Sequence, residues 1–190
     1  MNLPRLILAS ASPRRTELLR QLGISFETMA SDVEELHNEQ LTARELSQVN
    51  AYRKARAVAK QHPDALVLGA DTLVYLDQKL FGKPANLAEA QGMLEALQGC
   101  THEVVTGVCL VHLRRHRQII FADSTWVTFK HLNSEQICRY LRAINPLDKA
   151  GAYAIQEHGE MLIREVRGSW NNVIGLPTER LHEALALFRV

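Results

Sequence analysis

The chain has 190 residues, a length typical of one domain, and 46% of them are hydrophobic, which is enough for a sizeable core. The 22 basic and 21 acidic side chains give a formal net charge of +1, which argues against a surface that coats nucleic acid. The longest apolar runs are under ten residues and the N-terminal residues lack a signal-peptide pattern, so we expect no membrane span. Three widely spaced cysteines favour reduced thiols and a cytoplasmic protein.

Helix and strand patterns alternate along the chain. In chain order they predict a strand at 5–9, a helix from Pro13 that stops at Gly23, a strand at 24–30, a helix at 42–61, strands at 65–76 and 79–82, a helix at 87–97, strands at 103–113 and 118–129, a helix at 134–143, strands at 161–166 and 172–174, and a helix at 178–188. Turns at 77–78 and 114–117 make two hairpins, which argue against a purely parallel sheet. The predicted fold class is therefore α/β, with a mixed sheet and flanking helices.

The start of the first predicted helix combines a cap with two positive charges. Ser12 fits the N-cap and Pro13 the first helical position, which places Arg14 and Arg15 in the first turn. The helix dipole disfavours cations there by roughly 0.3–1 kcal/mol each, but a bound polyanion reverses that penalty and also meets free backbone N–H groups. Two interpretations are about equally supported. The arginines bind phosphate, or they are solvated and Ser12 only caps the helix.

Asp71 follows the apolar run 66–70, so its carboxylate is expected where a buried strand emerges at the mouth of the sheet. Gly69 within that run would let another backbone approach closely. Taken alone, the pattern favours an N-cap or turn role for the aspartate over a catalytic one.

The predicted hairpin brings a lysine toward the same corner. A two-residue turn at 77–78 pairs Val74 with Phe81 and Thr72 with Lys83. Lys83 is then expected beside the carboxylate that ends the apolar run.

Four further polar residues have no role that spacing alone assigns. Glu35 follows other acidic residues in a polar loop, and Lys54 lies on the long helix. As isolated charges, both are better explained as surface residues. Lys149 and Gln156 lie in a segment of small residues that allows tight loop packing.

Five segments, taken in order, resemble the Maf family of nucleotide pyrophosphatases. They are residues 8–15 (LASASPRR), 69–72 (GADT), 82–84 (GKP), 148–153 (DKAGAY) and 175–177 (GLP). The resemblance covers almost the whole chain. It implies a single Maf-like domain over residues 1–190, with an elongated sheet and two lobes around a central cleft, similar to inosine triphosphatases.

The resemblance also implies roles for individual residues. Carried over by motif, the side chains that bind the triphosphate are Ser10, Arg14, Arg15, Lys54 and Lys83. Glu35 and Asp71 are expected to hold a divalent metal, Mg²⁺ or Mn²⁺, and Asp71 is the expected catalytic proton acceptor. Such members cleave a nucleoside triphosphate to the monophosphate and diphosphate, and many are homodimers.

Three specificity positions separate two subgroups of that family. Arg14, Thr72 and Gln156 match the group that acts on dTTP and UTP, whereas a group acting on 7-methyl-GTP has glutamine and glutamate at the last two positions. Ala154 and Glu157 depart from the more usual glycines. A non-catalytic nucleotide-binding regulator of cell division is the alternative from another functional class.

Overall fold

The computed structural model of the protein describes residues 3–38, 40–77 and 79–189. The strands are β1 (Leu6–Leu8), β2 (Glu27–Thr28), β3 (Leu66–Leu76), β4 (Lys79–Phe81), β5 (Thr101–His112), β6 (Arg117–Phe129) and β7 (Ile163–Arg167). The helices are α1 (Pro13–Gln21), α2 (Ala43–Gln61), α3 (Leu87–Leu97), α4 (Ser134–Ala143), α5 (Gly159–Leu162), α6 (Trp170–Ile174) and α7 (Thr178–Ala186), with short 3-10 turns at Leu113–Arg115 and Ala150–Ala152.

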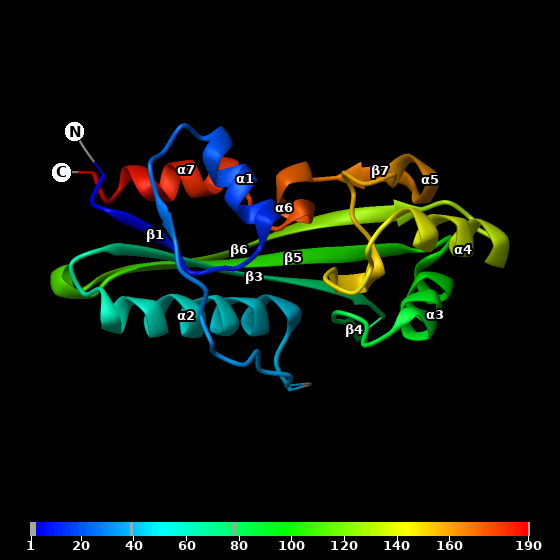
Figure 1. The fold of residues 1–190 in the computed structure, drawn as a ribbon, viewed down its shortest axis with the longest axis horizontal. Helices are drawn as coiled ribbons and strands as arrows, with labels where there is room; N and C mark the ends of the chain where they lie inside the picture. The colour runs from blue at the N-terminus through cyan, green and yellow to red at the C-terminus, as the bar shows by residue number, and fades with distance from the viewer. Residues whose placement is uncertain (1–2, 39, 78, 190) are drawn as a thin grey trace. The chain divides into compact units, whose positions relative to one another are not determined.

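The described strands form one 7-stranded mixed sheet in the order β2-β1-β3-β5-β6-β7, with β4 paired to β3 (Figure 1). β1 runs parallel to β2 and β3, whereas β4 and β7 run antiparallel to β3 and β6. The predicted α/β class with a mixed sheet is confirmed. Within the described residues, no helix is long and apolar enough to cross a membrane.

The chain divides into two compact units. The first contains the residues up to Asp71, Thr106–Asp123 and the residues from Gly175 onward; the second contains Thr72–Val105 and Ser124–Ile174. Strands β3, β5 and β6 therefore each contribute residues to both units.

In the first unit, α1 and α7 lie on one face of β1 and α2 lies on the other (Figure 1). α1 begins as predicted, because the Ser12 side chain accepts a hydrogen bond from the backbone of Arg15 and proline occupies the first turn. Gly23, with φ +67°, follows the end of that helix. α2 begins at a reciprocal capping box between Thr42 and Glu45. Its buried face is rich in alanine, which allows the helix to lie close to the sheet.

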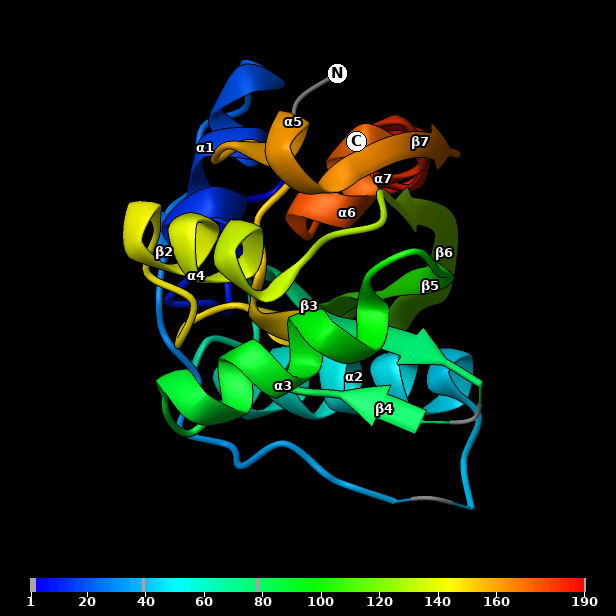
Figure 2. The same cartoon turned by 90° about the vertical axis from the view of Figure 1, so that its right-hand side faces the viewer.

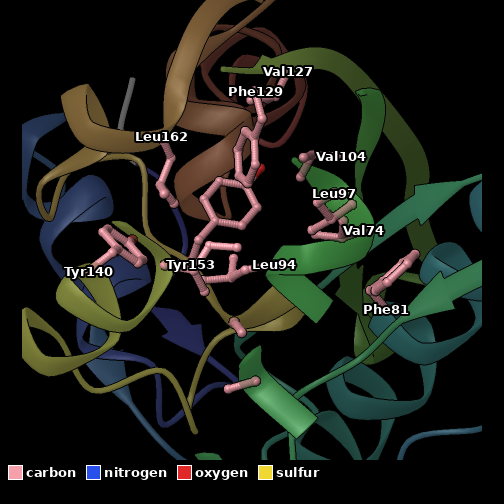
Figure 3. Packing of buried hydrophobic residues seen from close by; sticks show 13 residues of the cluster. Val74, Phe81, Leu94, Leu97, Val104, Val127, Phe129, Tyr140, Tyr153 and Leu162 are labelled. Carbon is pink, nitrogen blue, oxygen red and sulfur yellow. The ribbon is translucent and has the colours of Figure 1, made fainter. Parts of the chain in front are cut away.

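In the second unit, α3 lies beside α4 (Figure 2), and residues of both helices belong to one buried cluster that contains aromatic side chains. Phe129 and Tyr153 meet edge to face with ring centroids 4.9 Å apart, and Leu94 and Leu97 of α3 pack in the same cluster (Figure 3). The ring of His102 also packs edge-on against Phe129, at 4.8 Å. A histidine is thus part of an otherwise apolar core.

One predicted strand is wrong, and another is much shorter in the structure than expected. The segment 172–174, expected as a strand, belongs to helix α6, because the Ser169 side chain accepts from the backbone of Asn172 and the buried Asn172 amide donates to Val104 and Thr125. These tertiary bonds outweigh the strand propensity of a three-residue segment. The strand expected at 24–30 is reduced to Glu27–Thr28.

The predicted register of the β3–β4 hairpin is confirmed where it is paired. Val74 faces Phe81, but β4 ends there, so the ladder does not extend to Thr72 and Lys83 as expected. The carbonyl of Gly82 instead accepts a 3.0 Å hydrogen bond from the backbone of Gly151. The predicted turn at 77–78 lies partly outside the described residues.

The buried imidazole of His102 predicts acid sensitivity. Its Nε2 lies 2.8 Å from the Tyr153 hydroxyl, its Nδ1 has no partner within the described residues, and burial lowers the pKa of His102 to about 4. Since the pKa of His102 is lower in the folded protein than in the unfolded chain, its contribution to the free energy of unfolding is fully present above about pH 6.5. This contribution is lost as the pH falls toward 4. The free energy of unfolding should be about 3 kcal/mol lower at pH 4 than at neutral pH, and the substitution His102→Gln should abolish most of this difference.

Urea unfolding at pH 7 and pH 4 measures this effect. The exposed His37→Gln variant is the matched control and should keep the wild-type difference between the two pH values. If His102→Gln lost as much stability between pH 7 and pH 4 as the wild type, other titrating groups would be the cause.

Candidate active site

Two glycines allow α2 to lie directly on the sheet. A Cβ on Gly69 of β3 would collide with the carbonyl oxygen of Ala51 and lie 2.8 Å from the amide nitrogen of Ala55. A Cβ on Gly107 of β5 would collide with the backbone of Ser47, one turn earlier in the helix. The close backbone approach predicted at Gly69 is therefore confirmed. This contact places the polar side chains of α2 next to Asp71, which is buried in the middle of β3 and not at the mouth of the sheet as expected.

A buried lysine joins the two predicted carboxylates. Lys54 Nζ of α2 lies 2.7 Å from Asp71 Oδ1 and 2.6 Å from Glu35 Oε1. The side chains of Lys54 and Asp71 are only 11% and 3% exposed. Such burial of a charged group is sustained only by close partners, which the lysine and the two carboxylates provide for each other.

Asn50 completes this cluster, and sequence reasoning missed it. Its Nδ2 donates to Asp71 Oδ2 at 3.2 Å. The same amide group accepts from the backbone N–H of Leu36 at 2.8 Å and donates to its carbonyl at 3.2 Å, which ties down the loop that carries Glu35. The available signal was a polar residue one helical turn before Lys54, on the face that carries the buried alanines of α2.

The environment of Asp71 shifts the pKa of its carboxyl group upward. Burial raises the pKa of Asp71 above its ordinary value, and the nearby Glu35 carboxylate raises it further, whereas the Lys54 ammonium lowers it. A carboxylate with a raised pKa accepts a proton more readily than an exposed aspartate. The cluster is therefore suited to general base chemistry.

The predicted phosphate cradle has a fixed arginine. Ser10 Oγ accepts from the backbone N–H of Ser12 at 3.2 Å and from Arg15 Nη1 at 3.3 Å. Arg15 Nε also donates to the carbonyl of Gly175 at 2.9 Å. Its guanidinium is thus held by two segments that are distant in the sequence.

Electrostatics link this arginine to the carboxylates. Desolvation lowers the pKa of Arg15, while the charges of Asp71 and Glu35 act in the opposite direction and that of Arg14 adds to the lowering. A desolvated cation at a helix N-terminus gains from an anionic ligand, because the ligand replaces lost hydration and the helix dipole favours a negative charge there.

The first unit thus contains six of the predicted site residues, namely Ser10, Arg14, Arg15, Glu35, Lys54 and Asp71. The other three, Thr72, Lys83 and Gln156, belong to the second unit, where Lys83 and Gln156 are exposed. Within that unit, the bond from Gly151 to Gly82 connects the segment before Gln156 to the segment before Lys83.

Glu35 and Asp71 can hold a metal ion only if water and a bound ligand supply further oxygen donors. Over residues 3–38, 40–77 and 79–189, no group of three or more His, Cys, Asp or Glu side chains is arranged to hold a metal ion. Glu35 and Asp71 nevertheless already share one cation, the Lys54 ammonium. Mg²⁺ is often held by one or two carboxylates and completed by water and substrate phosphates, so this oxygen donor set suits it.

The fold and the cluster define a class of protein: an α/β chain with a buried carboxylate–lysine site close to a basic helix start. The family model described as Maf-like protein matches residues 5–188, so this chain belongs to that family.

The family assignment is supported by relatives that match nearly the whole chain. A protein of Desulforamulus reducens named dTTP/UTP pyrophosphatase is 45% identical over 185 residues, which are 97% of this chain and 97% of that protein. A protein of Akkermansia muciniphila with the same name is 45% identical and covers 96% of each chain. A solved HAM1 protein from Coxiella burnetii aligns with a TM-score of 0.55 over 97% of this chain and all of that one; at 20% identity this similarity concerns the fold alone.

Proposed function

We propose that the protein is a nucleoside triphosphate pyrophosphatase that hydrolyses dTTP and UTP to the monophosphate and diphosphate. The observation that carries the proposal is the buried cluster of Lys54, Asp71 and Glu35 in the unit that also holds the Ser10–Arg15 helix start. The names of the relatives support the substrate class. A site that accepts protons next to cations that favour phosphate suits attack of water on a phosphoanhydride.

Each residue of the first unit has a separate task in the proposed mechanism. Arg14 and Arg15, at the N-terminus of α1, bind phosphate oxygens and stabilise the charge that develops on the leaving diphosphate. Asp71 takes the proton of the water that attacks the α-phosphorus. Lys54 orients the Asp71 carboxylate and offsets its charge, as its 2.7 Å contact allows.

The charge balance favours a metal at this site. The three cations Arg14, Arg15 and Lys54 exceed the two carboxylates by one charge, whereas a nucleoside triphosphate carries about four negative charges at neutral pH. We propose that Glu35 and Asp71 hold Mg²⁺ or Mn²⁺ with phosphate oxygens. When bound, such an ion withdraws charge from the phosphates and polarises water.

The second unit supplies the proposed selectivity for the base. Thr72 and Gln156, with Arg14, favour a pyrimidine, since a glutamine amide can both donate to and accept from the edge of the base. Lys83 is the proposed further phosphate contact. These roles rest on the motif match and on the exposure of Lys83 and Gln156.

A substrate panel tests the proposed function. The purified protein is incubated with dTTP, UTP, CTP, GTP or 7-methyl-GTP in the presence of Mg²⁺, and the products are separated by anion-exchange chromatography. We expect diphosphate release, fastest with dTTP and UTP. Orthophosphate as the first product would contradict attack at the α-phosphorus, preference for 7-methyl-GTP would contradict the pyrimidine assignment, and no product from any nucleotide would favour a binding regulator.

The proposal extends to the state of the protein in the cell. We propose a homodimer in the cytoplasm, built from one Maf-like domain per chain. The three cysteines, Cys100, Cys109 and Cys138, are free thiols, which suits a reducing compartment. Sedimentation velocity of the purified protein tests the dimer.

A further inference from the structure

A buried lysine holds the loop between α4 and α5 from the inside. The side chain of Lys149 is 5% exposed, and its ammonium donates to the Asn145 carbonyl at 2.6 Å and to Asp148 Oδ1 at 2.9 Å. It also forms an ion pair with Glu157 Oε2 at 3.3 Å. An ammonium has three donors, so these three oxygens match its capacity. The loop is thereby closed on itself across the nine residues from Lys149 to Glu157.

A second anchor fixes the middle of the same loop. The hydroxyl of Tyr140, on α4, donates to the Ala154 carbonyl at 3.3 Å and accepts from the Ala154 backbone N–H at 3.0 Å. Tyr140 is fully buried, so this pair of bonds attaches the Ala154 peptide to a rigid helix.

Gln156 lies between these two anchors. The backbone N–H of Glu157 faces the Ala154 carbonyl at 3.4 Å, which closes a turn around Ile155 and Gln156. Ile155 is buried, whereas Gln156 is exposed. The turn therefore directs the Ile155 side chain into the core and leaves the Gln156 side chain exposed, provided that both ends of the turn stay in place.

We propose that the Lys149–Glu157 ion pair is a positioning device that holds Gln156 in the conformation that recognises the base. The inference rests on the proposed function, in which Gln156 contacts the pyrimidine. Neither Lys149 nor Glu157 needs to touch the nucleotide. The ion pair acts by reducing the freedom of the turn, so that the amide of Gln156 is already oriented when the base arrives.

Glu157→Ala tests this role, because Glu157 is 39% exposed and its removal leaves Lys149 with two oxygen partners. We expect KM for dTTP to rise about tenfold and kcat to stay within about twofold, since the loss affects orientation of the base and leaves the phosphate site unchanged. The preference for dTTP over GTP should fall by a similar factor. Glu157→Gln keeps an acceptor for the ammonium and should restore KM to within about threefold of wild type.

Glu160→Ala is the matched control. It removes the same charge three residues later, but Glu160 is 76% exposed and lies 3.7 Å from its partner, His158. This variant should keep wild-type KM and base preference. Unchanged kinetics in Glu157→Ala, or equal effects of Glu157→Ala and Glu160→Ala, would overturn the inference.

Hydrogen exchange separates a failure of the inference from a failure of the proposed function. In the nucleotide-free protein, backbone amides of residues 154–157 should exchange faster in Glu157→Ala than in wild type and in Glu160→Ala. A wild-type protein that cleaves no nucleotide would overturn the proposed function, and the exchange rates would then still decide whether the ion pair orders the turn. Exchange rates unaffected by Glu157→Ala would overturn the positioning role itself.

Discussion

Asp71→Asn should lower kcat for dTTP by about 10²–10⁴-fold while the protein stays folded. The amide keeps the shape of the side chain but cannot accept the proton of the attacking water, and it binds a divalent cation less well. Because burial penalises the charged form of Asp71, the neutral amide removes that cost, and Glu35 still pairs with Lys54. Steady-state kinetics with Mg²⁺ and urea unfolding of the same preparation measure both effects.

Asp64→Asn is the control for this loss of one carboxylate. Asp64 is exposed and pairs with Arg114 in a surface salt bridge, so its change should alter neither kcat nor stability by much. If Asp71→Asn retained wild-type turnover, the assignment of Asp71 as proton acceptor would be wrong.

Gly107→Ala should destabilise the protein by about 3 kcal/mol or more, the upper end for overpacking of a core. The new Cβ would collide with the carbonyl group of Ser47 and lie 2.5 Å from the amide nitrogen of Gln48. Both are backbone atoms of α2, so no side chain can rotate away to relieve the clash. The helix must shift, and Lys54 shifts with it, so turnover should fall together with stability.

Gly92→Ala provides the matched comparison. Nothing lies within 4 Å of a Cβ at Gly92, which is inside α3, and alanine there should stabilise the helix by about 0.5–1 kcal/mol. Urea midpoints that move in opposite directions for the two variants would support the packing argument. A Gly107→Ala midpoint equal to wild type would show that α2 is free to adjust.

Sequence reasoning predicted those structural features of the candidate site that a local pattern determines. The cap at Ser12, the apolar run before Asp71 and the close approach at Gly69 each follow from a few neighbouring residues, and each is present in the structure. The roles of Glu35 and Lys54 came only from the family resemblance, because isolated charges in a loop and on a helix have no distinctive spacing.

The remaining features depend on contacts between distant segments. Gly107 carries no local signal, since its importance comes from a helix sixty residues earlier in the chain. Asn50 reaches Leu36 and Asp71 only after α2 has docked. The same dependence explains the error at 172–174, where the side-chain bonds of Asn172 to other strands set the helical conformation.

The packing of α2 makes the site depend on helical phase. Ser47, Ala51 and Ala55 recur every four residues and lie against the sheet glycines, while Asn50 and Lys54, also four apart, reach the Asp71 carboxylate. One residue inserted between Ser47 and Lys54 would rotate the part of the helix after the insertion by about 100° relative to the part before it. The Lys54 side chain would then point away from both carboxylates. Between Ser47 and Ala55, helix α2 therefore cannot gain or lose a single residue without disrupting its contacts to the sheet glycines and to Asp71.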